Sequence, residues 1–384
     1  MKKKVVLRAP LLTVSGYGEH SRQIFKWLSS RPDVELSVQT LNWGNTSWYI
    51  NPQLEDGLIG EIMKRTSDKS TGYDYSFQVQ LPDEWDSSIA SRNIGITAGV
   101  ETDRCHSVWT DRIKDRVSEV IVPSEFTKKT FVNTDPSISE KIFVVPEALS
   151  IDPSLECEDF LSEVKTKNNF LVISQLTAVD RSQDRKCIAD TLEVISKCIK
   201  DKPDWGVIIK TNVGRGTEKD HLETLHILGQ FKGLKGKTHL LHGILSSKQM
   251  LGVYKSPKIR AFATLTRGEG FGLPILEAAS CDIPVFATGW SAHSEFLSLG
   301  KYGKVSCTLV PIPETKEDPR IFMKGSMWAH PDKIDFEKKI NKFIQSPEVP
   351  KQWARELGEK LRSQYSQQEI EKKLNNFASE RLGW

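Results

Sequence analysis

Short apolar runs alternate with amphipathic stretches along most of the 384-residue chain. Helical periodicity is clearest at His20–Ser29, Cys187–Lys200 and Lys219–Lys232, and Ser124 is placed to cap a further helix. Apolar strands separated by amphipathic helices are typical of parallel sheets covered by helices on both faces. The runs that predict strands are Val5–Leu7, Val34–Val38, Ile94–Thr97, Glu119–Val122, Ile142–Val145, Phe170–Ser174, Gly206–Lys210, His239–Leu241, Ala261–Leu265, Pro284–Ala287 and Val305–Val310.

A stretch without clear periodicity divides this pattern in two. From Pro146 to about Asn168 the chain is acidic and polar, and beyond Pro331 the pattern is helical to the end. A chain of 384 residues is longer than a single core usually supports, so two domains are expected. We predict an N-terminal α/β domain over 1–150, a linker over 151–168, a second α/β domain over 169–330, and a helical tail over 331–384 that packs back across the domains.

Composition narrows the class of protein. Apolar residues make up 38% of the chain and charged residues 27%, and no run approaches the ~20 apolar residues that cross a bilayer. The start Met1–Lys4 is charged and Arg8 interrupts the apolar run, which indicates a strand rather than a secretory signal, so a cytoplasmic location is expected. Six cysteines without a C-x-x-C pair suggest neither a zinc site nor a disulfide framework. The net charge of +3 neither requires nor excludes a nucleic-acid partner.

The most informative stretch follows the apolar run Ala261–Leu265. Residues 267–281 read Arg-Gly-Glu-Gly-Phe-Gly-Leu-Pro-Ile-Leu-Glu-Ala-Ala-Ser-Cys. The glycines let the backbone approach a ligand, and Pro274 suits the first turn of a helix whose free N–H groups attract an anion or hydroxyl oxygens. Glu269 and Glu277 can accept hydrogen bonds from different hydroxyls of one ligand. A polyol carrying a diphosphate fits this combination, and a glycine-rich turn with two solvated glutamates is the alternative.

This stretch resembles the E-x7-E element of the family 4 retaining glycosyltransferases, which have the GT-B fold. The resemblance implies an α/β protein with two Rossmann-like domains that face each other across a cleft, followed by the helical tail. It also implies that Glu269 contacts the donor sugar and Glu277 the ribose. Asp282 stands where the family usually has glycine. The backbone implied in donor binding is Gly270, Phe271, Gly272 and Leu273, and the similarity continues at Gly243, Ser247, Tyr254, Pro284, Val285 and Glu295.

A basic loop follows the run Phe170–Ser174. The family places an arginine directly after this strand and a lysine several residues later, both on the donor diphosphate. Lys186 matches the lysine, and Arg185 lies beside it. Gln175 occupies the usual arginine position, so Arg181 would substitute for it from the lengthened loop. These cations would neutralise the leaving diphosphate as charge develops; a solvated basic turn is the alternative.

A second glycine loop, over residues 15–22, follows the first strand. Gly16 and Gly18 allow a tight turn, and the N-terminus of the next helix could hold a phosphate. The loop resembles the one that faces the donor phosphates in GT-B transferases, which would bring His20 and Arg22 to the acceptor side. A plain strand–helix turn, with His20 on the helix surface, is the alternative.

The loop at 99–104 resembles the acceptor-side loop of some family 4 members. It follows the run Ile94–Thr97, where parallel α/β proteins place ligand groups. Glu101 and Asp103 would position the acceptor hydroxyl, and an ordinary surface loop is the alternative. No D-x-D triplet occurs in the sequence, so we expect neither a metal nor a cofactor, with the nucleotide-sugar as co-substrate.

Two aromatic-containing stretches suggest an acceptor. Tyr17–Phe25 and Leu41–Trp48 are similar to a subgroup found in tailed phages, some of which glycosylate 5-hydroxymethylcytosine in their DNA. Double-stranded DNA is therefore the first candidate acceptor, uridine diphosphate the expected donor nucleotide, and glucose or arabinose the expected sugar. The alternatives are transfer to a surface polysaccharide, lipid-linked sugar or protein, and a nucleotide-sugar-binding protein without catalysis. Side chains that could meet DNA are Lys64, Arg65, Arg104, Arg112, Lys114 and Arg116, with Trp43, Trp48, Tyr49 and Trp109 as stacking candidates.

Overall fold

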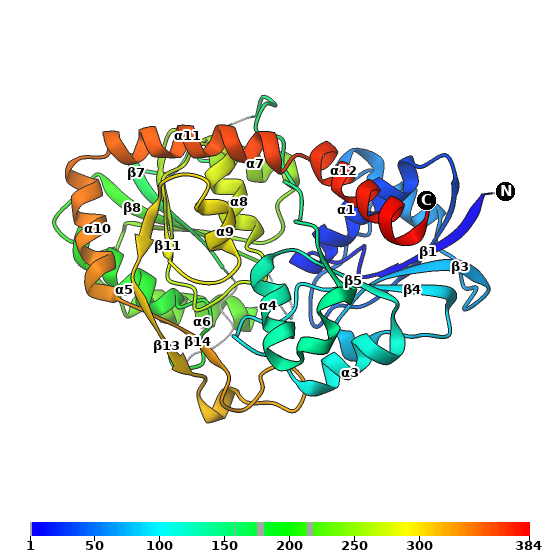
Figure 1. Cartoon of the computed structure of the whole chain (residues 1–384). Helices are drawn as coiled ribbons and strands as arrows, with labels where there is room; N and C mark the ends of the chain where they lie inside the picture. The colour runs from blue at the N-terminus through cyan, green and yellow to red at the C-terminus, as the bar shows by residue number, and fades with distance from the viewer. Residues whose placement is uncertain (1, 158, 175–179, 213–217) are drawn as a thin grey trace. The chain divides into compact units, whose positions relative to one another are not determined.

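Two six-stranded parallel sheets with flanking helices form the framework of the protein in a computed structural model (Figure 1). The structure describes residues 2–157, 159–174, 180–212 and 218–384. The chain divides into two compact units. Unit 1 comprises Met1–Ser150, Glu317–Ser326 and Gln364–Trp384, and unit 2 comprises Ile151–Lys316 and Met327–Ser363.

The sheet of unit 1 has the strand order β2-β1-β3-β4-β5-β6, and every neighbouring pair is parallel. Its strands are β1 (Lys3–Ala9), β2 (Val34–Thr40), β3 (Tyr73–Val79), β4 (Ala90–Ile96), β5 (Glu119–Val122) and β6 (Ile142–Val144). Its α-helices are α1 (Gly16–Ser30), α2 (Leu58–Lys64), α3 (Ser107–Arg116), α4 (Glu125–Thr134) and α12 (Gln367–Phe377). Ser124 caps α4 by accepting from the backbone of Thr127, as predicted.

The central strand β3 is one that the hydrophobic pattern does not single out. Ser76 and Gln78 stand at fully buried positions of this strand, where an apolar side chain would have marked it. The Ser76 hydroxyl lies 2.7 Å from Asn93 Oδ1, and the Gln78 amide donates to the carbonyl of Asp86 at 2.7 Å. Since buried polar groups need such partners, this network lets a mixed polar sequence occupy the middle of a sheet.

The sheet of unit 2 has the strand order β12-β11-β10-β7-β8-β9, again with parallel neighbours. Its strands are β7 (Asn168–Ile173), β8 (Trp205–Thr211), β9 (Thr238–His242), β10 (Ile259–Thr264), β11 (Val285–Thr288) and β12 (Gly303–Val305), and an antiparallel pair is formed by β13 (Cys307–Pro311) and β14 (Met327–Pro331). Its α-helices are α5 (Ile188–Ile199), α6 (Glu218–Gly229), α7 (Ser247–Lys255), α8 (Leu273–Ser280), α9 (His293–Leu297), α10 (Lys333–Gln345) and α11 (Glu348–Gln364).

The apolar run Val305–Val310 is two strands rather than the single strand predicted. Val305 ends β12 and Cys307 begins β13. Ser306 separates them, because its N–H donates to Asp335 Oδ2 and its carbonyl accepts from the N–H of Asp332, both at 2.8 Å. The backbone of Ser306 is therefore used at the start of α10 and not in a sheet.

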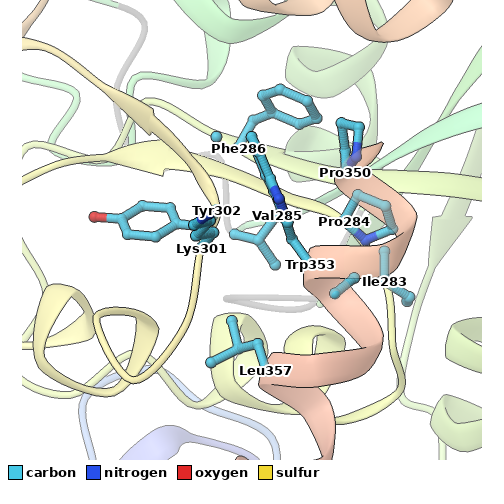
Figure 2. Close-up of a pocket in the computed structure, with 11 residues that line it drawn as sticks. Ile283, Pro284, Val285, Phe286, Lys301, Tyr302, Pro350, Trp353 and Leu357 are labelled. Carbon is cyan, nitrogen blue, oxygen red and sulfur yellow. The ribbon is translucent and has the colours of Figure 1, made fainter. Parts of the chain in front are cut away.

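The C-terminal segment is helical, as predicted, and its helices belong to different units. Helices α10 and α11 are part of unit 2, and α12 is part of unit 1. A cavity of about 20 Å³ lies between α11 and β11, and Figure 2 shows Pro350, Trp353 and Leu357 of the helix beside Val285 and Phe286 of the strand. It is apolar and far too small for a nucleotide-sugar. This cavity is therefore a packing feature of unit 2.

Candidate active site

The glycine-rich stretch connects β10 to α8 at the carboxyl edge of the unit 2 sheet. Gly272 caps α8 with φ +102, and a Cβ at this position would lie 3.1 Å from the Cβ of His293. Both the backbone conformation and the limited space favour glycine. Pro274 lies in the first turn of α8, where its missing N–H removes no helical hydrogen bond.

Glu269 is the centre of a buried charge cluster in this turn. Its carboxylate receives Lys186 Nζ at 2.7 Å on both oxygens and the hydroxyl of Thr266 at 2.8 Å. Arg185 lies 3.4 Å from the same carboxylate and donates to the carbonyl of Gly268 at 2.5 Å. Residues from two separate loops of the sheet therefore converge on one carboxylate.

The charge state of Glu269 follows from these contacts. Burial raises the pKa of its carboxyl group, but the charges of Lys186 and Arg185, with hydrogen bonds from Lys186 and Thr266, overcome this and lower the pKa to about 2. Glu269 is therefore ionised at neutral pH. The site presents one carboxylate and two cations side by side.

Asp184 fixes the loop that carries the two cations. Its Oδ2 accepts from the N–H of Ile188 at 2.7 Å, and its Oδ1 accepts from the N–H of Lys186 at 3.0 Å. The carbonyl of Arg185 accepts from the N–H of Arg267 at 2.8 Å. The start of α5 is thereby joined to the glycine-rich turn, although sequence reasoning missed Asp184.

The prediction for Arg181 is not supported. The structure places Arg181 at the surface of α5, 2.8 Å from Glu193 and 3.6 Å from Asp190. Arg185 is the arginine that the fold brings to Glu269. Gln175, at the position expected for the family's arginine, lies outside the described residues.

Glu277 lies on α8 and is partly buried. The hydroxyl of Tyr254 in α7 donates to its Oε2 at 2.8 Å. Burial, the charge of Glu277 and this hydrogen bond hold the pKa of Tyr254 well above its ordinary value, so the phenol stays protonated and donates. Tyr254, which the resemblance included without a role, therefore orients the second carboxylate.

The departure at Asp282 has a local explanation. This residue has φ +60, in the left-handed region that favours glycine. Its carboxylate lies 2.7 Å from the guanidinium of Arg362 on α11, which also donates to the carbonyl of Ser280. The ion pair offsets part of the backbone cost and joins α11 to the end of α8.

Lys210 is a polar residue at the carboxyl edge that the prediction missed. It lies near the end of β8, almost fully buried, and donates to the carbonyls of Gly243 at 2.6 Å and Thr211 at 3.1 Å. Burial lowers the pKa of its ammonium group to about 8. A lysine that ends an apolar strand was the available signal, and its contacts hold the turn after β9.

In unit 1, the second glycine loop is shaped by packing. A Cβ at Gly18 would lie 2.2 Å from the carbonyl oxygen of Thr13, and the N–H of Gly18 donates to the capping hydroxyl of Ser15 at 3.0 Å. A Cβ at Gly16 would meet nothing within 4 Å. Gly18 is therefore required by the approach of the loop after β1, and only Gly16 keeps space around it.

His20 and Arg22 are buried, which corrects the expectation that they reach toward an acceptor. Arg22 donates to the carbonyls of Leu11 at 2.9 Å and Thr13 at 3.1 Å. His20 Nδ1 lies 3.8 Å from Glu147, and burial lowers the pKa of His20 to about 4. Arg22 therefore holds the loop after β1 from inside the unit, and His20 lies beside Glu147.

The loop that carries Glu101 and Asp103 lies at the same edge of the unit 1 sheet as the glycine loop. The Tyr17 hydroxyl is 2.9 Å from Thr97 Oγ1 and accepts from the N–H of Ala98 at 3.1 Å, which joins the two loops. Glu101 and Asp103 are partly buried. The structure therefore brings both predicted loops of this unit together.

The predicted DNA-contacting side chains differ in accessibility. Trp109 is fully buried and Tyr49 is 7% exposed, so neither can stack on a base. Trp43 stacks on Tyr17 with ring centroids 3.8 Å apart, and Trp48 is 36% exposed. The aromatic expectation is therefore wrong for the first pair and stays a prediction for the second.

Several of the basic side chains have acidic neighbours. Lys64 and Arg65 lie 2.8 and 2.7 Å from Glu61. Arg104 lies 3.7 Å from Asp103, and Lys114 pairs with Asp135. These four cations therefore share three carboxylates, which offset most of their positive charge.

Two further properties concern the described part of the chain only. Within residues 2–157, 159–174, 180–212 and 218–384, no helix is both long and apolar enough to cross a membrane. Over the same ranges, no group of three or more histidine, cysteine, aspartate or glutamate side chains is arranged to hold a metal ion.

Comparison with known proteins gives matches in sequence and in structure. Residues 165–357 match the family model of the group 1 glycosyl transferases. A probable sucrose-phosphate synthase of Thermosipho melanesiensis is 27% identical over 186 residues, which cover 48% of this chain and 41% of that protein. The chain therefore matches less than half the length of this curated relative.

Solved structures match over nearly the whole chain. Anabaena HepE, in complex with UDP and glucose, gives a TM-score of 0.67 at 15% identity, covering 98% of this chain and 100% of its own. Sucrose-phosphate synthase from Thermosynechococcus elongatus gives a TM-score of 0.62 at 12% identity, with full coverage of both chains. At these identities the likeness concerns the fold, and it confirms the predicted GT-B class.

Proposed function

Because this chain belongs to the group 1 family of glycosyl transferases, we propose that it moves a glucosyl or arabinosyl group from a UDP-sugar to an acceptor hydroxyl. We propose further that the transfer retains the configuration at the sugar carbon and uses neither a metal nor a cofactor. The observation that carries the proposal is the cluster of ionised Glu269 with Lys186 and Arg185 at the carboxyl edge of the unit 2 sheet. One carboxylate beside two cations suits a ligand that combines hydroxyls with a diphosphate.

Each group in this cluster has a distinct role in the proposed reaction. Glu269 accepts hydrogen bonds from the donor sugar, while Lys186 and Arg185 contact the diphosphate. As the bond from the sugar carbon to the phosphate oxygen breaks, negative charge grows on the diphosphate, and the two cations stabilise it. Arg185 takes the role that the sequence gave to Arg181, because Arg185 lies against the cluster.

The remaining contacts complete the donor and acceptor sites. Glu277, oriented by Tyr254, binds the ribose, and the backbone at the start of α8 binds sugar or phosphate. In unit 1 we assign Glu101 and Asp103 to the acceptor hydroxyl. Gly16 remains the candidate for phosphate contact in the glycine loop, because space is left around it.

For the acceptor, the first proposal from sequence resemblance is 5-hydroxymethylcytosine in phage DNA. The three carboxylates beside Lys64, Arg65, Arg104 and Lys114 offset most of their charge, which favours a second candidate, an uncharged glycan hydroxyl. A protein that follows a phosphate backbone needs cations that replace counterions, and cations already paired with carboxylates do this less well. The exposed Trp48 is compatible with either acceptor, since aromatic rings stack on bases and on sugar faces.

Incubation with labelled UDP-glucose and UDP-arabinose tests the function directly. Hydroxymethylated duplex DNA, the unmodified duplex and a panel of glycans serve as acceptors. We expect label transfer to one acceptor class with release of UDP. Retained UDP binding without transfer or hydrolysis would identify a binding protein instead. A DNA acceptor also requires affinity that falls with salt, at a log–log slope of about −0.9 per phosphate contact.

Excess chelator is expected to leave turnover unchanged. In the proposed reaction, Lys186 and Arg185 supply the positive charge that a divalent ion would otherwise provide. Initial rates are compared with and without EDTA, and with added magnesium or manganese. A rate that falls in EDTA and recovers with either ion would contradict the metal-independent assignment.

Replacing Glu277 by glutamine is expected to weaken UDP binding about tenfold. A hydrogen bond to a charged group is worth about 1.5–3 kcal/mol, and glutamine keeps an acceptor for the hydroxyl of Tyr254. Titration calorimetry with UDP alone measures the effect. Tyr254→Phe is the matched control, because it removes the internal hydrogen bond to Glu277 and leaves the carboxylate; its UDP affinity is expected to change less. Equal affinities for Glu277→Gln and the wild type would remove Glu277 from the ribose site.

A further inference from the structure

The loop between β11 and α9 reaches the backbone of Glu269 through a chain of hydrogen bonds. The N–H of Glu269 donates to Ser291 Oγ at 2.9 Å. Ser291 Oγ lies 3.2 Å from His293 Nδ1, and His293 Nε2 lies 2.7 Å from the carbonyl oxygen of Thr288. A carbonyl oxygen only accepts, so Nε2 carries the proton and Nδ1 accepts from the serine hydroxyl.

Burial keeps this series of hydrogen bonds in one protonation state. His293 is fully buried and Ser291 is 6% exposed. Burial lowers the pKa of His293, and the charge of Glu269 opposes this only in part, so the imidazole is neutral at neutral pH. Each hydrogen bond therefore has one direction. The N–H of Glu269 donates to Ser291, the hydroxyl of Ser291 donates to His293, and His293 donates to the carbonyl of Thr288.

Ser291 has a backbone conformation that would suit glycine better than serine. This residue has φ +76, in the left-handed region where glycine is far less strained. A glycine here would relieve the strain but would remove the hydroxyl that accepts from Glu269. The strained serine therefore indicates that the hydroxyl is needed at this position.

We propose that Ser291 and His293 are positioning residues that hold the peptide of Glu269, and through it the carboxylate that faces the donor sugar. The carboxylate end of Glu269 is held by Lys186 and Thr266, neither of which is altered by a change of the serine. The backbone end is held by Ser291, which His293 orients through its ring. The inference rests on the proposed role of Glu269 in donor-sugar binding.

The variant Ser291→Gly separates positioning from stability. We expect its free energy of unfolding to stay within about 1 kcal/mol of the wild type, because relief of the left-handed strain offsets the lost hydrogen bond. We expect kcat to fall about tenfold, since the loss of one buried hydrogen bond is worth about this factor. The Kd for UDP, which lacks the sugar, is expected to stay within about twofold. A wild-type kcat, or a kcat that falls only together with stability and UDP affinity, would overturn the proposal.

His293 is tested by a matched pair of variants. In His293→Asn the amide oxygen keeps an acceptor near the position of Nδ1, whereas His293→Leu removes it. We expect the asparagine variant to retain several times more kcat than the leucine variant at similar UDP affinity. Equal kcat values for the two variants would show that the acceptor for Ser291 does not matter.

A spectroscopic readout distinguishes failure of this inference from failure of the proposed function. If the wild type transfers no sugar from any nucleotide-sugar, the proposed function fails, and kinetics no longer test the loop. Long-range nitrogen–proton NMR of the imidazoles then tests directly whether His293 makes the hydrogen bonds described above. We expect His293 to be neutral and protonated on Nε2, with an Nδ1 resonance that moves in Ser291→Gly. A proton on Nδ1, or an unchanged Nδ1 resonance in the variant, would overturn the chain itself.

Discussion

Glu269→Gln is expected to reduce kcat/KM for the nucleotide-sugar about 100-fold while UDP binding persists or becomes tighter. The amide keeps the shape of the side chain but loses the charge that strengthens its hydrogen bonds to sugar hydroxyls, at about 1.5–3 kcal/mol each. In the proposed donor complex of the wild type, the diphosphate shares Lys186 and Arg185 with the carboxylate of Glu269. Removal of that charge leaves both cations to the phosphates, so the affinity for UDP alone is not expected to fall.

Steady-state kinetics with the sugar donor and calorimetry with UDP measure the two effects separately. Thr266→Val is the matched control within the site, because it removes one hydrogen bond to the same carboxylate and leaves its charge. Glu193→Gln is the surface control, since Glu193 pairs with Arg181 and Lys197 on α5, outside the cluster. We expect at most a few-fold change for each. Joint loss of UDP binding and transfer in Glu269→Gln would assign Glu269 to the diphosphate side or to structure.

The main features of the proposed donor site could be predicted from the sequence because the signals are local. Glycine, proline and two carboxylates occur within one strand-to-helix segment, and the resemblance assigns Lys186 to the donor diphosphate of the same site. In a parallel sheet the loops after β7 and β10 lie at the same edge, since these strands are neighbours. The contact between Lys186 and Glu269 follows from this topology, although 83 residues separate them.

What the sequence did not predict depends on directions of side chains in three dimensions. Arg181 and Arg185 are equally basic, and only the folded loop, in which Asp184 accepts from the N–H groups of Lys186 and Ile188, distinguishes Arg185 beside Glu269 from Arg181 beside Glu193. Ser291 matters through a left-handed backbone that no pattern of hydrophobicity encodes. Arg22 resembled a ligand-binding residue in sequence, yet its guanidinium donates to two backbone carbonyls inside unit 1.

Replacing Lys186, the partner of the buried Glu269 carboxylate, is expected to lower the free energy of unfolding more than any other single change in the cluster. In Lys186→Met, Glu269 keeps only Arg185 at 3.4 Å and the hydroxyl of Thr266. A buried charge that has lost its partner typically destabilises a protein by several kcal/mol, so we expect a loss of about 3 kcal/mol in the free energy of unfolding at pH 7. The double variant Lys186→Met with Glu269→Gln should recover most of this loss, because it removes both charges.

The pH dependence of this loss identifies its electrostatic origin. In the wild type, the pKa of Glu269 is lowered from 4.5 to about 2, so its pairing stabilises the protein above about pH 4.5, and this stabilisation is lost as the pH falls toward 2. Without Lys186, the pKa of Glu269 loses the largest of the charges that lower it, and protonation at low pH relieves the poorly paired charge. The difference in unfolding free energy between the wild type and Lys186→Met should therefore narrow from pH 5 to pH 3, as measured by urea unfolding. Lys197→Met, which breaks only a surface pair with Glu193, should change stability by less than about 0.5 kcal/mol at either pH. A difference that stays constant with pH, or a double variant as unstable as Lys186→Met, would show that Lys186 stabilises the fold through packing of its aliphatic chain rather than through its charge.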